Sequence, residues 1–341
     1  MTTKKLVFRP GSIVLNCGDG TAQFGLDSRW ALRLGGLANH EIEWLQDAAH
    51  RAKPPAAIAA SHQVAYERAA AISATLKHAE LLLTNPTPPK SKPVISNEIA
   101  TLNSAAELPA LSALRPDGDG HQTLLTRAQR TVAISSGCRI GAGLALLLAT
   151  AGVGRVIILD DGPVLDTDLG PYRACHLGLP RRNAIAQLVA EVAPAVQVTA
   201  DGTSDVVVSV EFGTQTSAYF GPLLSLATPH LPIATQEASA EVGPFMLPNQ
   251  TACAHCLQLT RSSVDASWAG LVSEIARHAA IGVEATVACA TIGLAAGQVL
   301  SYIAGVRPAL LNQLATISAP DLLPRLTEVP PHPDCGCVLM G

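Results

Sequence analysis

Apolar and polar residues follow two different periods along the second half of the chain. Short apolar runs, typical of buried strands, are separated by longer stretches with helical spacing. Strands that alternate with helices predict a mostly parallel sheet with right-handed crossovers, so we expect a doubly wound, Rossmann-like α/β domain. The expected strands span residues 131–134, 155–160, 196–199, 205–210 and 232–235, and the expected helices follow the turn at 135–141 and span 181–192 and 217–226.

The N-terminal part has another pattern, in which short β-like runs precede helices. Turn signals at Pro10-Gly11 and Gly18-Asp19-Gly20 separate these runs. Prolines crowd residues 84–93 and are incompatible with a helix or a central strand there. We therefore expect three parts: a small β-then-α module at 1–55, a helical segment with a proline-rich linker at 56–118, and the α/β domain at 119–341.

Composition narrows the class of function. The formal net charge is −4, charged residues make up 15% of the chain and aromatic residues 4%, so we expect no basic, base-stacking surface for nucleic acid. The N-terminus lacks the apolar stretch of a signal peptide, and the apolar helix expected near Leu144 is too short to span a bilayer. These features predict a cytoplasmic protein without a nucleic-acid or membrane partner.

The turn between the first strand and the first helix of the α/β domain is a candidate nucleotide site. Glycines in such a turn permit a tight bend, the approach of phosphate and close helix packing, with phosphate at the helix N-terminus. The register set by residues 151–154 places Ser136, Cys138 and Gly141 at these positions, and Gly137 offers a shifted turn. Phosphate binding and a purely structural turn both remain open.

Two further features lie at the same predicted edge of the sheet. Asp160 ends the second strand, where it can bond a ribose hydroxyl or cap the loop that begins at Gly162. Arg181 and Arg182 begin a helix, where cations gain nothing from the helix dipole. This conflict favours binding of phosphate or carboxylate by guanidinium, with a solvated charge pair as the alternative.

Four cysteines form two close pairs from distant segments. Two such pairs can complete a closed tetrahedral thiolate site, which is typical of structural zinc. A redox Cys-x-x-Cys or a reducible bridge are the alternatives. Cys175 has His176 beside it, but sequence neighbours on an extended chain point in opposite directions, which argues against a nucleophile. The predicted zinc ligands are Cys253, Cys256, Cys335 and Cys337.

The order of these motifs resembles the ThiF/MoeB superfamily, which includes the ubiquitin-activating enzymes. The resemblance covers residues from about 120 to 341, and residues 242–259 and 332–337 resemble the branch found in actinobacteria and in azoline peptide biosynthesis. Members of that branch often carry an N-terminal peptide clamp, so the resemblance implies a winged-helix-like peptide-binding module at 1–55. The motifs that carry it are Ala151-Gly-Val-Gly154, Ile158-Leu-Asp160, Gly178-Leu-Pro-Arg181 and the two cysteine pairs.

In this superfamily a peptide or sulfur-carrier carboxylate attacks the α-phosphate of MgATP. The resemblance implies that Asp160 binds the ribose and that Arg181 takes the place of a phosphate-binding lysine. It places Arg173 as the substitute for an arginine that is replaced by Pro171, and Asp168 where an asparagine is usual. The implied nucleotide-binding residues are Ser136, Gly137, Gly141 and Asp160, and the implied catalytic residues are Arg173, Arg181 and Glu211.

The departures from the superfamily pattern are concentrated at the reaction centre. Cys138 replaces a glycine of the turn, and Phe212, beside Glu211, stands where the magnesium aspartate is expected. One hypothesis is a ThiF-like protein with a degenerate ATP site that binds a peptide leader or small carrier protein and presents it to a separate modifying enzyme.

The second hypothesis is an active ATP-dependent adenylyltransferase that rebuilds the site in altered geometry. An NAD-linked oxidoreductase fits less well, because it leaves the cysteine pairs unexplained. Superfamily members commonly pair through this domain, so the resemblance also implies a homodimer.

Overall fold

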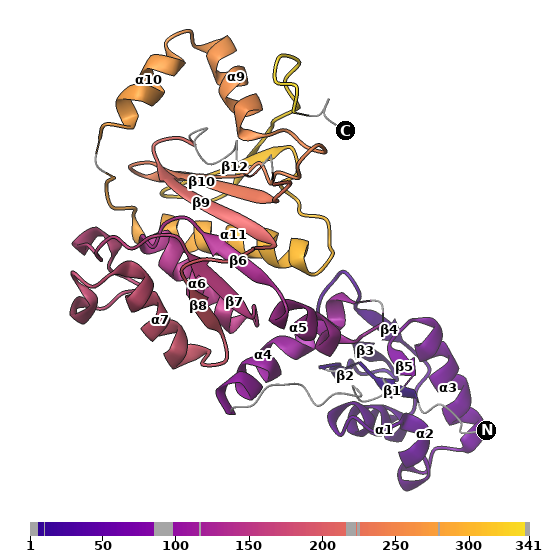
Figure 1. Ribbon diagram of the computed structural model, residues 1–341. Coiled ribbons are helices and arrows are strands. Elements are labelled where there is room, and N and C mark those ends of the chain that lie inside the picture. The colour runs from indigo at the N-terminus through magenta and orange to yellow at the C-terminus, as the bar shows by residue number, and fades with distance from the viewer. Residues whose placement is uncertain are drawn as a thin grey trace. The chain divides into compact units, whose positions relative to one another are not determined.

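The structure is a computed structural model, shown in Figure 1, that forms two compact units, Met1–Leu125 and Thr126–Gly341. The predicted linker lies outside the described residues from residue 85 onward, and so does most of the helix predicted at 217–226. The residues that the structure describes are 6–9, 11–84, 98–115, 117–215, 223, 226–278 and 280–337.

The N-terminal unit contains two small antiparallel sheets and several helices. Strand β1 pairs with β5, and β2, β3 and β4 form a three-stranded sheet. The early strands and the helix that follows them have the predicted order of β before α. The elements are β1 (Leu6–Phe8), β2 (Val14–Asn16), β3 (Ala22–Phe24), β4 (Leu32–Leu34), α1 (Asn39–His50), α2 (Pro55–Ile58), η1 (Ala60–His62), α3 (Tyr66–His78), β5 (Leu82–Thr84), α4 (Glu98–Leu114) and α5 (Gly120–Ala128).

A separate core holds this unit together. The α1 side chains Trp44 and Leu45 are fully buried, and the indole Nε1 of Trp44 donates to the carbonyl of Pro55 at 2.8 Å. Phe8 and Phe24 bring the two sheets together, with ring centroids 6.1 Å apart. Helix α3 belongs to the same core, so residues beyond 55 are part of the packing of this unit. Membership of the winged-helix class stays a prediction.

The C-terminal unit is built on one eight-stranded sheet with the order β13-β12-β11-β10-β9-β6-β7-β8. The five strands from β8 to β10 are parallel, and β11, β12 and β13 extend the sheet in antiparallel pairs. The elements are β6 (Thr131–Ile134), α6 (Arg139–Thr150), β7 (Arg155–Ile158), η2 (Asp166–Asp168), η3 (Ala174–His176), α7 (Arg181–Val192), β8 (Gln197–Thr199), β9 (Val206–Phe212), β10 (His230–Thr235), β11 (Ser239–Val242), α9 (Ala254–Val264), α10 (Trp268–Ile275), α11 (Ala285–Ile303), β12 (Gln313–Ser318) and β13 (Arg325–Glu328).

The parallel part confirms the doubly wound α/β prediction. The chain runs outward from β6 through β7 to β8, and then returns to place β9 on the other side of β6. This reversal creates a topological switch point between β6 and β9, where such sheets bind ligands beyond their carboxyl ends. The turn after β6 therefore lies where the sequence predicted a site.

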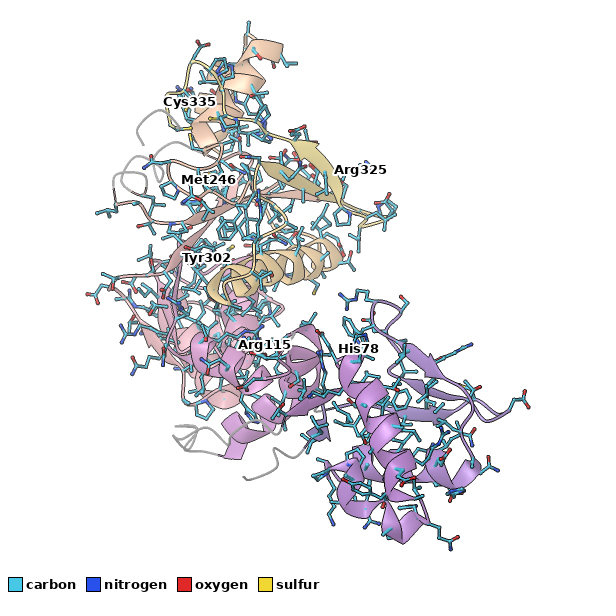
Figure 2. All side chains as sticks on the ribbon, turned by 90° about the vertical axis from the view of Figure 1, so that its right-hand side faces the viewer. His78, Arg115, Met246, Tyr302, Arg325 and Cys335 are labelled. Carbon is cyan, nitrogen blue, oxygen red and sulfur yellow. The ribbon has the colours of Figure 1, made fainter. Side chains whose placement is uncertain are left out.

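Side-chain alternation explains how the sheet is covered. In β6, Val132 and Ile134 pack into the large core that α6, α7 and α11 complete, whereas Ala133 packs into a small cluster on the opposite face. Helix α11 carries Tyr302, labelled in Figure 2, whose ring centroid lies 5.2 Å from that of Phe245.

Helix α11 is apolar and longer than α6, the helix near Leu144. It is the one described helix that is long and apolar enough to cross a membrane by length and composition, and 44% of its apolar window is buried inside the fold. It packs against α6 and the sheet as a core helix.

Gly141 fixes the distance between helix α6 and the turn after β6. A Cβ atom at this position would lie 1.8 Å from the carbonyl oxygen of Ser136, which belongs to the backbone and has no freedom to move aside. The glycine therefore permits the close helix packing that was predicted for the third glycine of the turn. Gly293 in α11, by contrast, has no atom within 4 Å of such a Cβ.

We predict that Gly141→Ala lowers the free energy of unfolding by about 3 kcal/mol, because the new methyl group must displace the turn. Gly293→Ala is the matched control and should raise stability by about 0.5–1 kcal/mol, since alanine loses less entropy in a helix. Urea unfolding followed by circular dichroism measures both. Equal effects of the two substitutions would contradict this account of Gly141.

Candidate functional site

Ser135 joins the two strands at the switch point. It directly follows β6, and its N–H donates to the carbonyl of Val208 at 3.0 Å. Its Oγ accepts from the N–H of Val210 at 2.9 Å, and the side chain is buried. A hydroxyl in this position ties the carboxyl end of β6 to β9, so the turn begins from a fixed point.

Asp160 receives four hydrogen bonds from its own chain. Its Oδ2 accepts from the N–H of Gly137 at 2.8 Å, from Ser136 Oγ at 3.3 Å and from Arg181 Nη1 at 3.0 Å. Its Oδ1 accepts from the N–H of Gly162 at 2.8 Å. The structure thus brings Ser136, Gly137, Asp160 and Arg181 together, as the sequence predicted.

The surroundings of Asp160 favour its charged form. Partial burial raises its pKa, but the N–H groups of Gly137 and Gly162 and the Arg181 guanidinium outweigh burial. The net result is a pKa below the ordinary value of 3.8.

Arg181 is held between two carboxylates. It begins helix α7, and its Nε and Nη2 donate to Asp168 Oδ2 at 2.9 and 2.7 Å while Nη1 reaches Asp160. The side chains of Arg181 and Asp168 are 16% and 4% exposed, so both charges are largely removed from water. We refer to Asp160, Arg181 and Asp168 as the acid–arginine cluster. The two carboxylates explain why an arginine stands at the start of helix α7.

Two residues that the sequence analysis did not single out hold the turn and the start of α6 in place through contacts with other segments. The hydroxyl of Tyr172, which is buried, donates to the carbonyl of Gly137 at 2.6 Å. Arg139, the first residue of α6, donates to the carbonyls of Leu169 at 2.6 Å and Val283 at 2.7 Å. Both contacts join segments far apart in the sequence, and no local motif marks them.

Cys138 precedes helix α6 at the position where phosphate would approach. Burial raises the pKa of its thiol, against the opposing effect of the N–H groups of Gly141 and Ile140, which face the sulfur. A neutral thiol therefore lies at the helix end whose N–H groups bind anions in nucleotide sites.

The three other candidates, Arg173, Glu211 and Cys175, have different surroundings. Arg173 is 63% exposed and pairs with Glu191 at 2.8 Å. Glu211 lies inside β9 with Ala234 of β10 as its register partner, because β9 runs to Phe212 instead of ending earlier. Cys175 is exposed beside the buried imidazole of His176, whose Nδ1 accepts from the N–H of Arg173.

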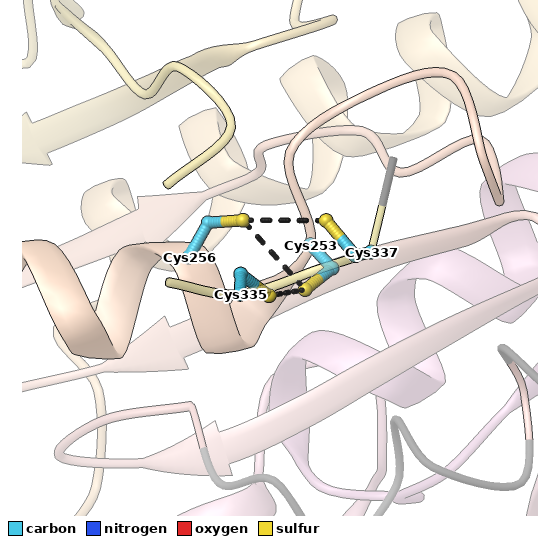
Figure 3. Close-up of side chains that lie close together, drawn as sticks. All are labelled: Cys253, Cys256, Cys335 and Cys337. Carbon is cyan, nitrogen blue, oxygen red and sulfur yellow. Dashed lines mark hydrogen bonds between the residues drawn. The ribbon is translucent and has the colours of Figure 1, made fainter. Parts of the chain in front are cut away.

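The four predicted zinc ligands converge at a second site, shown in Figure 3. Helix α9 contributes Cys253 and Cys256 at its N-terminus, and the C-terminal segment contributes Cys335 and Cys337. All four Sγ atoms lie within 4.8 Å of one another, and three of the separations are 3.4, 3.4 and 3.9 Å. Zinc–sulfur bonds of about 2.3 Å in a tetrahedron place sulfurs about 3.8 Å apart, so the residues could hold zinc.

The surroundings of these thiols also suit a metal. Burial, and then the neighbouring Cys256, raise the pKa of Cys337 to about 12, and burial likewise raises that of Cys335. Crowded thiolates repel one another, and a divalent cation offsets this repulsion and holds them deprotonated. Figure 2 shows Cys335 on the C-terminal segment, close to Met246 of the same small core.

We predict that Asp160→Asn lowers the free energy of unfolding by about 2 kcal/mol at pH 7, because it removes the charge from buried hydrogen bonds. A depressed pKa stabilises the fold above the unfolded-state pKa, and this contribution is lost as pH falls through the folded-state pKa. The difference in the free energy of unfolding between variant and parent should therefore narrow below about pH 4. Asp161→Asn, 62% exposed, is the matched control and should change stability by less than about 0.5 kcal/mol at either pH. Urea titrations of the parent and both variants at pH 7 and pH 3 measure these differences.

We predict about one zinc ion per chain in protein purified without chelators. Cys256→Ser and Cys337→Ser should each reduce the bound zinc well below this level and lower the melting temperature, since each removes one of four thiolates. Cys17→Ser, at an exposed position, should keep the full zinc content. Elemental analysis and thermal scanning measure these effects, and zinc loss in the control as large as in the ligand variants would disprove this site.

Comparison with known proteins supports this geometry at the level of the fold. No protein-family model matches the sequence, and no curated protein is significantly similar to it. The microcin C7 biosynthetic enzyme MccB in complex with N-formylated MccA is 14% identical, with a TM-score of 0.70, and the match covers 98% of this chain and 99% of that chain.

Two further structures show the same likeness. MccB of E. coli with ATP has a TM-score of 0.67 at 14% identity over 98% of this chain and 99% of that chain. PaaA has a TM-score of 0.70 at 16% identity over 94% of this chain and 98% of that chain. The shared fold agrees with the ThiF/MoeB resemblance of the sequence. Along nearly its whole length, this chain has the fold of MccB and PaaA.

Proposed function

We propose that this chain binds a peptide or protein substrate and presents it for modification, with a degenerate ATP site. MccB, which has the same fold, is a biosynthetic enzyme solved in complex with MccA. The N-terminal unit, for which the superfamily resemblance of the sequence implies peptide binding, would hold the substrate, and the C-terminal unit would supply the scaffold. A separate enzyme would then carry out the modification.

The hydrogen bonds that Asp160 accepts are the observation that best supports a degenerate ATP site. Three donors of this chain share Oδ2, and Oδ1 accepts from the N–H of Gly162. A ribose hydroxyl that bonds to Oδ2 would have to displace one of its three donors. Displacing Arg181 would also leave a largely buried guanidinium short of a partner, which is costly.

The N–H groups of the turn are also engaged within the chain. The N–H of Ser135 bonds to Val208, that of Gly137 to Asp160, and that of Cys138 to Ser136 Oγ at 3.3 Å. Phosphate binding at a helix N-terminus depends on such groups pointing at the ligand. Here they stabilise the turn itself, so binding energy for a nucleotide would first have to offset these contacts.

The catalytic candidates support the same conclusion. Arg173 is engaged with exposed Glu191, and Glu211 is part of a strand. Arg181 pairs with both Asp160 and Asp168, and this pairing competes with any magnesium ion at those carboxylates. Adenylation needs positive charge at the phosphates, whereas here the Arg181 guanidinium is directed towards protein carboxylates.

An active adenylyltransferase is the second candidate. It is favoured by the solved complex of MccB with ATP and by the position of Asp160 and Arg181 at the predicted edge of the sheet. It requires Arg181 to turn from Asp160 towards the phosphates when MgATP binds. Pyrophosphate release upon addition of a peptide substrate would establish it.

We predict that the protein shows no saturable MgATP binding below about 1 mM by calorimetry. The double variant Cys138→Gly, Arg181→Lys should bind MgATP at least about tenfold more tightly, because it opens the turn and frees Asp160. Cys17→Gly, Arg325→Lys changes the same residue types at exposed positions and should behave like the parent. Tight MgATP binding by the parent, with release of pyrophosphate, would refute the degenerate site.

A further inference from the structure

Exposed apolar side chains gather around one pocket in the N-terminal unit. Among the described residues of Met1–Leu125, five large apolar side chains are exposed: Ile13, Leu26, Trp30, Tyr66 and Leu114. The first three line the same pocket, although they come from separate positions along the chain. Exposed apolar residues that converge on one concave surface indicate a binding site more strongly than scattered ones do.

The pocket has an apolar floor and a volume that suits a single side chain. Phe8 and Phe24, whose rings stack, form part of the floor together with Leu81. Its volume is about 190 Å³. An apolar cavity of about 150 Å³ accepts benzene, so this pocket has room for a leucine or phenylalanine side chain. It lies beside the end of α3, next to His78, which Figure 2 labels.

Trp30 forms one wall of the pocket and is held in place by contacts within the N-terminal unit. The Arg29 guanidinium lies 4.4 Å from the centroid of the indole ring, on which it stacks. Asp27 holds Arg29 through three hydrogen bonds, and this pairing lowers the pKa of Asp27 to about 2. The N–H of Trp30 also donates to the carbonyl of Asp27 at 3.1 Å. An ordered wall reduces the entropy that binding would otherwise cost.

The charged groups at the rim are paired with one another. Arg9 is 15% exposed, its Nε donates to the carbonyl of Glu80 at 2.7 Å, and its Nη2 lies 3.6 Å from Glu80 Oε2. Glu80 is 71% exposed, and Arg29, which is 64% exposed, pairs with Asp27. The rim therefore carries balanced charges of both signs, and the apolar interior of the pocket decides which ligand it suits.

We infer that this pocket binds one apolar side chain of the peptide, leucine or phenylalanine in size. The inference rests on the proposed function for the peptide itself and specifies which kind of side chain the N-terminal unit recognises. Apolar burial supplies the affinity. The pocket is independent of the acid–arginine cluster, since its lining residues all belong to the N-terminal unit.

Methyl NMR of the full-length protein tests the inference. The probe is the acetylated, amidated pentapeptide Gly-Lys-Leu-Lys-Gly, with an analogue that has serine for leucine. We expect the leucine peptide to shift the Ile13 and Leu26 methyl signals saturably. The serine analogue should bind about tenfold more weakly, because the apolar burial is lost.

Surface variants make the test specific to the pocket. Leu26→Ser and Ile13→Ser replace exposed side chains and should each weaken binding of the leucine peptide several-fold. Tyr66→Ser, which replaces a still more exposed side chain outside the pocket, should bind the peptide unchanged. Identical binding of the leucine and serine peptides, or of the leucine peptide by parent and Leu26→Ser, overturns the inference. Saturable shifts at Leu32 and Leu34 of β4 alone would overturn it while leaving the proposed peptide binding intact. Release of pyrophosphate from MgATP would refute the degenerate site without affecting the pocket.

Discussion

The candidate nucleotide site depends on a single buried contact, the guanidinium of Arg181 between the carboxylates of Asp160 and Asp168. Asp160 follows β7, Asp168 ends the 3₁₀ helix η2, and Arg181 begins α7, so the contact joins three segments of the crossover to one another. Asp160 extends it to the turn after β6 through the N–H of Gly137. Charges that are this far from water are costly unless each is paired, so the four segments stabilise one arrangement together.

The same contact lies at the switch point of the sheet. The topology creates this switch point at the carboxyl ends of β6 and β9, and the turn follows β6. Groups that the superfamily resemblance assigns to nucleotide binding bond to one another here, since Asp160 accepts from both Arg181 and the N–H of Gly137. The degenerate site that we propose would separate this fold from the reaction usual for it.

The antiparallel end of the sheet has a different source of stability. Its small separate core includes Cys253 and Cys256 together with Met246 and Leu314. A core of this size contributes little by itself, and a tetrahedral metal centre would compensate by joining α9 to the C-terminal segment. Strand β13 is exposed along its whole length, and β12 is its only partner among the strands that the structure describes. Because β13 has no apolar stripe, hydrophobic periodicity does not predict it.

The sequence by itself determined the parallel strands, the close-packing glycine at Gly141 and the pairing of the four cysteines, because these depend on local periodicity, backbone sterics and ligand type. It also indicated Asp160 and Arg181 as neighbours at one edge. Only the tertiary structure decided that Arg181 faces Asp168, that Arg173 pairs with Glu191 and that Glu211 lies within β9. It also brought residues from β1, β3 and the end of α3 together around one pocket. The physical reason is that hydrogen bonds and cavities form between segments distant in sequence, whose mutual direction no local pattern records.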